Sequence, residues 1–139
     1  MMKSIVLLAT ICACCGATPP AKSAEECNWN CNAPWTKTDI ALQGTLAGLQ
    51  IVDWAQTRWF IKHPDYLGPG RHTTESNPFL GENPSVGKVN NFIAASIIGH
   101  AVISHYLPSD YRTVWQGLWI VIEFDAVNHN RMAGVKLSF

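Results

Sequence analysis

The sequence predicts an all-α fold, a small helical membrane protein with about three transmembrane helices after an N-terminal signal peptide. Three observations lead to this prediction. Charged residues make up only 14% of the chain, whereas an average soluble domain has about 25%. Three apolar segments follow the N-terminal region, and each has close to the roughly 20 residues that cross a bilayer as a helix. The six Trp are typical of a protein with aromatic rings where lipid meets water.

The size and charge of the chain limit the classes of partner. With 139 residues, the protein forms one domain at most. Its 10 Lys and Arg balance its 10 Asp and Glu, so no net positive charge attracts nucleic acid. We therefore expect the lipid bilayer as the main partner, with other membrane proteins or a second copy of the chain as further candidates.

Residues 1–24 resemble an export signal. An early lysine precedes an apolar run from Ile5 to Ala13, which is too short to span a bilayer but matches the core of a signal peptide. Two processing routes remain open. A signal peptidase could cut after small residues near Ala24. Alternatively, "ICAC" resembles a bacterial lipobox that ends at the lipidation candidate Cys14, although it has Cys12 where Ser or Ala is common.

Residues 25–38 form the expected exported N-terminal segment. Cys27 and Cys31 are the cysteines that remain once the signal region is set aside. In an oxidising compartment this pair is a disulfide candidate. A metal pair is the alternative, but this short segment holds no further ligands, so the pattern favours the disulfide and assigns no metal.

Residues 39–139 form the predicted membrane domain, and its first helix covers about residues 39–61. Thr38 or Asp39 is the expected N-cap, and His63-Pro64 is a stop signal. Polar residues recur on one side of this helix at intervals of seven, three and four. They are Gln43, Gln50, Asp53 and Thr57. We expect this side to face the other helices, because polar groups inside a bilayer pair with one another.

The second helix is predicted over about residues 89–107 and the third over about residues 110–129, with Ser109 as its N-cap. A soluble three-helix bundle is the alternative interpretation. The second segment is nearly apolar on all sides, whereas a surface helix of a soluble bundle needs a charged face. Small-residue steps in the first two helices would let neighbouring helices approach closely. They are Gly44 with Gly48, and Ala95 with Gly99.

The distribution of cations predicts the orientation. Four cations lie in or beside the connector 62–88, whereas the turn between the second and third helices holds only Arg112. The four are Arg58, Lys62, Arg71 and Lys88. Because cations concentrate in cytoplasmic loops, we expect the connector and the C-terminus in the cytoplasm and residues 25–38 outside a bacterial-type inner membrane.

The connector ends in "NPFLGENPSVGK", which has two Asn-Pro pairs. Proline moves the residue before it away from helical geometry, so each pair favours a turn. We expect a re-entry turn that leads into the second helix. Its cap is Ser85, or Asn83 if a helical turn begins at Pro84.

A longer pattern joins the first helix to this connector. Asp53 and Gln56-Thr57 precede the run from Glu75 to Pro78. The pattern resembles an uncharacterised family of small prokaryotic multi-span membrane proteins, in which an Asp and a Thr late in one span precede Glu-x-Asn-Pro at the next. The chain departs from that family in its long connector and its export signal. The resemblance implies a membrane location and no known activity.

The candidate polar intramembrane cluster consists of Asp53, Glu75, His100 and Glu123. At 1.5 Å per residue, Asp53 and Glu123 reach the same depth and His100 lies slightly farther out. Three interpretations remain open. The groups stabilise the bundle, they conduct protons or ions, or they bind zinc or iron in a membrane enzyme. No catalytic motif is present, so the sequence favours a structural or interaction role in the envelope, with no catalytic residues and no cofactor.

Overall fold

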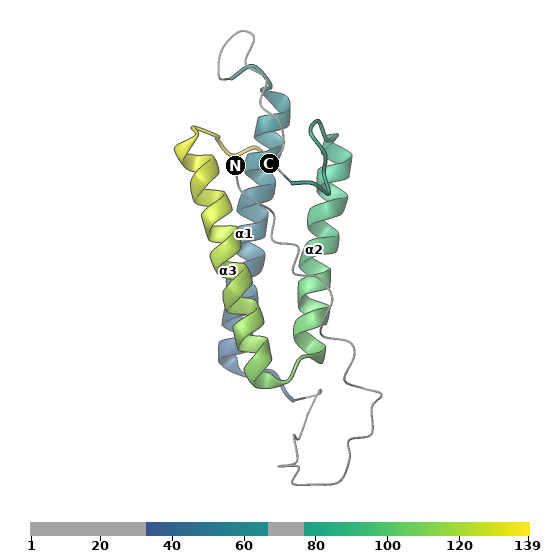
Figure 1. The fold of residues 1–139 in the computed structure, drawn as a ribbon, viewed down its shortest axis with the longest axis vertical. Helices are drawn as coiled ribbons and strands as arrows, with labels where there is room; N and C mark the ends of the chain where they lie inside the picture. Colours follow the sequence, from purple (N-terminus) through teal and green to yellow (C-terminus); the bar gives the residue numbers. More distant parts are fainter. Residues whose placement is uncertain (1–32, 67–76) are drawn as a thin grey trace.

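The computed structural model describes residues 33–66 and 77–139. Within them, the chain forms three α-helices and no strands: α1 (Lys37–Lys62), α2 (Val86–Tyr106) and α3 (Ser109–Met132). The prediction of an all-α fold is confirmed, and the helix bounds differ from the predicted ones by at most three residues. In Figure 1, α1 and α3 run in the same direction side by side, and α2 returns antiparallel to both.

The N-cap of α1 is Thr36, two to three residues before the expected cap, because Thr36 and Asp39 form a capping box. The Thr36 hydroxyl accepts a hydrogen bond from the Asp39 amide at 3.1 Å, and the Asp39 carboxylate accepts one from the Thr36 amide at 2.8 Å. This exchange satisfies backbone amides that would otherwise lack partners at a helix start. The helix ends where the sequence predicts, with His63 as its C-cap.

The other two helices begin differently. Ser85 caps α2 and accepts a hydrogen bond from the Lys88 amide at 3.2 Å, which is one of the two expected arrangements. Helix α3 has Pro108 at its N-cap and no side-chain cap, so Ser109 is its first residue and not its cap. Proline has no side-chain oxygen that could accept a hydrogen bond from a helix amide, so α3 lacks the kind of cap that Thr36 and Ser85 provide.

Two segments outside the helices also have ordered contacts. In the connector, the amides of Leu80 and Gly81 both donate to the Asn77 carbonyl, and Gly81 has a φ of 74°. At the C-terminus, the Ser138 amide donates to the Ala55 carbonyl at 2.9 Å, and the Phe139 ring packs against a tryptophan of α1. The end of the chain therefore packs against the second half of α1.

Polar residues occupy the interior of the bundle and apolar residues its outside. Among the described residues, five hydrophobic side chains are buried, as against eight polar or charged ones. The eight are Asp39, Gln50, Gln56, Thr57, His100, Ser104, Arg112 and Gln116. In contrast, large apolar side chains such as Ile98 (63% exposed) and Val114 (68%) point outward. This is the reverse of the pattern in soluble proteins, which bury apolar side chains and expose polar ones.

Among the described helices, only α2 is long and apolar enough to cross a membrane by itself, and only 17% of its apolar window is buried. The sequence predicted three such helices. Helices α1 and α3 fail this test of composition because they carry the interior polar side chains.

The glycine steps do not have the predicted role within this bundle. A Cβ atom added at Gly44, Gly48 or Gly99 would meet nothing within 4 Å. Gly44 and Gly48 are exposed, so the first step faces away from the neighbouring helices and does not bring them closer.

The turn at Gly81 provides a test of this geometry. An L-residue in the left-handed region costs about 1–2 kcal/mol, so Gly81→Ala should destabilise the protein by about 1 kcal/mol. Gly117→Ala is the matched control, because Gly117 is helical and has open space at its Cβ position; it should stabilise by about 0.5–1 kcal/mol. Chemical denaturation in detergent measures both, and equal effects would contradict the assigned turn.

Candidate functional site: a buried polar column

The candidate site is a column of polar side chains that follows the axis of the bundle. All three helices contribute to it, and we define the polar column by the following residues. They are Asp39, Gln43, Gln50, Asp53 and Gln56 of α1, Ser96, His100 and Ser104 of α2, and Arg112, Gln116, Glu123 and Asn130 of α3. The column is described below from the Arg112 end to the Asn130 end.

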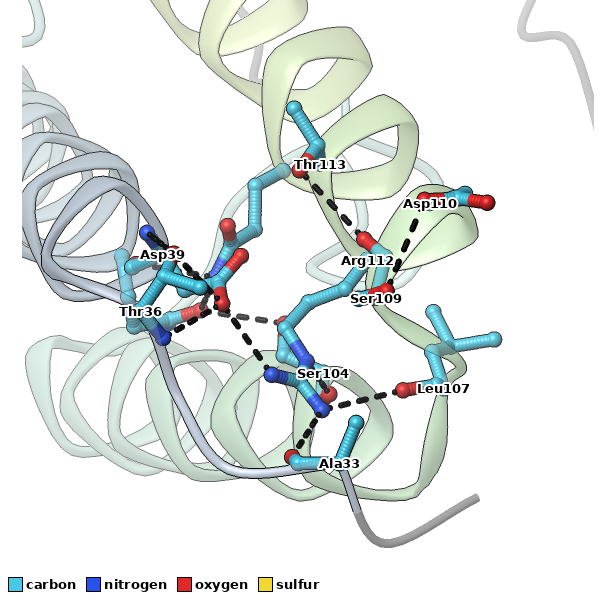
Figure 2. Close-up of polar contacts among 11 residues, drawn as sticks. Ala33, Thr36, Asp39, Ser104, Leu107, Ser109, Asp110, Arg112 and Thr113 are labelled. Atoms are coloured by element: carbon cyan, nitrogen blue, oxygen red, sulfur yellow. Dashed lines mark hydrogen bonds and ion pairs between the residues drawn. The ribbon is translucent and has the colours of Figure 1, made fainter. Parts of the chain in front are cut away.

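Arg112 closes the first end of the column, and Figure 2 shows the groups around its guanidinium. Its Nη1 forms an ion pair with the Asp39 carboxylate at 3.1 Å, and both side chains are buried, with 0% and 2% exposure. Its Nε donates to the Ser104 carbonyl at 2.8 Å. Its Nη2 donates to the carbonyls of Ala33 and Leu107, at 2.9 and 3.1 Å.

These contacts connect the ends of all three helices through one side chain. Ser104 and Leu107 lie at the end of α2, where carbonyls lack partners within the helix. Asp39 belongs to the cap of α1, and Arg112 itself lies in the first turn of α3. The ring of Trp35 lies 5.3 Å from the guanidinium and adds a cation–π contact. A buried charge is tolerated in a protein when it is paired and hydrogen-bonded in this way.

The Asp39 carboxylate is held by three hydrogen bonds. Its Oδ2 accepts from the Thr36 amide at 2.8 Å, from the Thr36 hydroxyl at 2.9 Å and from Arg112 Nη1 at 3.1 Å. These donors, one of them cationic, stabilise the negative charge of the buried carboxylate.

The second layer consists of three side chains, one from each helix. The Gln116 amide nitrogen donates to the Asp39 carbonyl and to Gln43 Oε1, both at 3.2 Å. The Ser104 hydroxyl donates to the same Gln43 oxygen at 3.1 Å. This network extends the cap of α1 into the interior of the bundle and fixes the register of the three helices.

The middle of the column contains an imidazole between indole rings. The centroid of His100 lies 4.5 Å from Trp119 and 5.5 Å from Trp115. In the next layer, the Gln50 amide nitrogen donates to the Ser96 hydroxyl at 2.9 Å.

Two carboxyl groups, Asp53 and Glu123, lie near the second end of the column. Their charges interact, and both side chains are half-buried. The Asn130 amide donates to Asp53 Oδ1 at 3.0 Å and to Gln56 Oε1 at 3.3 Å. Gln56 in turn donates to the Val127 carbonyl at 3.2 Å. These contacts connect the last turns of α3 to the second half of α1.

Several buried polar atoms have no hydrogen-bond partner among the described residues. Six of them border the column: Gln43 Nε2, Gln50 Oε1, His100 Nδ1, Trp115 Nε1, Gln116 Oε1 and Trp119 Nε1. The set includes obligate donors, such as the indole N–H groups, and obligate acceptors, such as the amide oxygens. Buried groups of this kind usually have partners in native proteins, often ordered water.

The structure brings together only part of the predicted cluster. Asp53 and Glu123 are close enough for their charges to interact. His100 lies in a separate layer with two tryptophans. No three His, Cys, Asp or Glu side chains in the described ranges are grouped as a metal site requires. Four other candidates, Glu75, Cys14, Cys27 and Cys31, lie outside those ranges.

Sequence reasoning missed the most connected residue of the site. It treated Arg112 only as a cation in a turn and Asp39 only as a cap. Two signals could have identified the pair: the Thr-x-x-Asp capping box, and a lone arginine between two apolar segments. A cation in that position either reaches water or needs a buried acceptor nearby.

Comparisons of the chain with protein-family models, with curated proteins and with solved structures found no match. The resemblance to small multi-span membrane proteins therefore stays a prediction.

The Arg112–Asp39 pair should dominate stability. Arg112→Met leaves a buried carboxylate without its charged partner, so we expect a loss of about 3–5 kcal/mol in the free energy of unfolding. Arg131→Met is the matched control, because Arg131 is exposed on the same helix; it should change stability by less than about 0.5 kcal/mol. Chemical denaturation in detergent measures both variants. Similar losses in the two would show that the ion pair is not essential.

Proposed function

We propose that the protein is a small exported integral membrane protein, with three helices in the bilayer and a structural or interaction role in a bacterial-type envelope. The observation that carries this proposal is the distribution of polarity, with polar groups between the helices and apolar groups outside. In a bilayer, the apolar surface contacts lipid and the polar groups pair with one another.

Helix α2 gives the most direct support. A long apolar helix can also be the core of a soluble protein, but such a helix is mostly buried, whereas most of α2 is exposed. In water, this would leave a large apolar surface uncovered. Lipid covers such a surface along its whole length.

Helices α1 and α3 fit the same environment as a pair. The apolar residues Val114, Leu118 and Val121 of α3 are exposed and recur every three or four positions, as expected for one face of a helix. The polar residues of α1 and α3 face each other across the column. With 26 and 24 residues, the helices are about 39 and 36 Å long. Both exceed the roughly 30 Å hydrocarbon core, so Asp39 and Arg112 lie near its boundary.

The orientation belongs to the same proposal. The buried Arg112 end carries one exposed cation, Lys37, whereas the other described cations lie toward the opposite end. They are Arg58, Lys62, Lys88, Arg131 and Lys136. The positive-inside rule then places that opposite end in the cytoplasm. The export signal at residues 1–24 and the candidate pair Cys27 and Cys31 fit an outer N-terminal segment.

A second function, a membrane proton or ion conduit, is favoured by one specific observation. Six buried polar atoms along the column have no partner within the described part of the chain. A column that served only to hold the helices together would satisfy its own polar groups, since each unsatisfied one destabilises the fold by about 1–3 kcal/mol.

Alkaline carbonate extraction tests the membrane proposal. We expect the protein to stay in the membrane pellet, because the apolar surfaces of all three helices contact lipid. A reporter fused after Phe139 should be active only in its cytoplasmic form. Release into the supernatant would indicate that another protein or a second copy covers α2, and a periplasmic reporter signal would reverse the orientation.

A further inference from the structure

We propose that one face of α1, together with the C-terminal segment 133–139, binds an anionic phospholipid. We call it the lipid-binding face and define it by Ile51, Trp54, Arg58 and Lys62. The acyl chain lies along the apolar part of this face, and the phosphate lies at the cations. The proposal rests on the membrane location proposed above, and it names the lipid partner at the end of the bundle that faces the cytoplasm.

The lipid-binding face changes from apolar to cationic along the helix. Its four residues follow one another at intervals of three or four, so they lie on one side of α1. Ile51 is 45% exposed at the apolar end, and Lys62 is exposed at the cationic end. Between them, the Arg58 guanidinium lies 4.7 Å from the centre of the Trp54 ring, in a cation–π contact. A phospholipid presents its acyl chain, its glycerol backbone and its phosphate in the same order.

The depth of these residues in a bilayer agrees with that order. A hydrocarbon core of about 30 Å that begins near Asp39 ends about 20 residues farther along α1, close to Arg58. Ile51 then lies about 10 Å inside the hydrocarbon. Lys62 lies beyond the boundary, at the level of the lipid headgroups.

The C-terminal segment adds a further cation and a further apolar side chain. In Figure 1 it crosses from the end of α3 to α1, where Lys62 Nζ donates to the Ser138 hydroxyl at 2.8 Å. Lys136 is two residues from Ser138, which is at most about 7 Å along the chain. Its exposed ammonium group therefore reaches the phosphate that Lys62 contacts. Toward the bilayer, the Phe139 ring packs on Trp54 with 6.3 Å between centroids and is 74% exposed.

The charge of the site favours an anionic headgroup. Arg58, Lys62 and Lys136 gather here, and each Lys or Arg near a membrane surface strengthens the attraction to anionic lipid. Lys62 uses one of its three N–H donors within the protein, so two are left for a phosphate. Asp53, the nearest acid of α1, lies on another side of the helix and accepts a hydrogen bond from α3. Asp65 lies beyond the end of the helix. Phosphatidylglycerol therefore fits this site better than the zwitterionic phosphatidylcholine.

Electron spin resonance of spin-labelled lipids tests the headgroup preference. The full-length protein is placed in phosphatidylcholine vesicles, and the motionally restricted fractions of labelled phosphatidylglycerol and labelled phosphatidylcholine are compared. We expect the wild type to prefer phosphatidylglycerol about fivefold or more, and Lys62→Gln or Lys136→Gln to lower this preference at least about twofold. Arg131→Gln is the matched control, because Arg131 is an exposed cation near the same end of the bundle, and it should leave the preference unchanged. Melting curves check that each variant is folded.

Photolabelling tests the position of the acyl chain. A phosphatidylglycerol with a diazirine in the middle of its acyl chain should label Ile51, Trp54 and Phe139 more than Ile98, an equally apolar and exposed residue of α2. Even labelling of all three helices would indicate an unspecific lipid shell and would overturn the site. Displacement of the labelled lipid by excess inorganic phosphate would show that the cations bind a free anion instead.

The outcomes separate this site from the membrane proposal. An inserted protein without a preference for phosphatidylglycerol would overturn the site alone, as would an equal loss of preference in Arg131→Gln and Lys62→Gln. A protein that does not float with the vesicles after a carbonate wash would overturn the membrane location and the site together.

Discussion

The fold depends above all on the neutralisation of one buried guanidinium. Arg112 is fully buried, and it satisfies its donors with one carboxylate and three backbone carbonyls. Those acceptors belong to the start of α1, the end of α2 and the chain that leads into α1. A geometry with this many partners fits only one arrangement of the three helix ends. The planar donors of arginine suit this role, whereas the single ammonium group of lysine would satisfy fewer of these acceptors.

The inverted polarity of the bundle follows from the same principle. A bundle that buries Arg112 and Asp39 also needs acceptors and donors for its other interior groups. Four hydrogen bonds in the layer of Gln43, Ser104 and Gln116 supply part of them. Farther along, the network becomes incomplete near His100 and Glu123. The donors of Arg112 are all paired, whereas buried polar atoms without partners occur from the Gln43–Gln116 layer onward. Stability comes from the Arg112 end, and any chemistry would use the layers beyond it.

The sequence predicted the helices well and the site only in part, for physical reasons. Periodicity, prolines and caps are local signals, so the three helices were found with small errors at their ends. The polar side of α1 was also visible in the spacing of Gln50 and Asp53. The partners of those residues were not, because hydrogen bonds such as that between Arg112 and Asp39 join positions 73 residues apart. Depth alone suggested that His100 joins the carboxyl pair, but side-chain direction places it against tryptophans instead.

The pairing of α1 with α3 has a consequence for biosynthesis. Residues of α1 find their polar partners on the last helix to be made, with α2 synthesised in between. At translation rates of about 5–20 residues per second, the 73 residues that separate Asp39 from Arg112 take roughly 4–15 s to produce. During this interval the Asp39 carboxylate has no charged partner, although α2 already supplies Ser96 and Ser104 to Gln50 and Gln43. Under the proposed membrane location, the Asp39 end of α1 needs shelter until α3 emerges, so the first and last helices would enter the bilayer together.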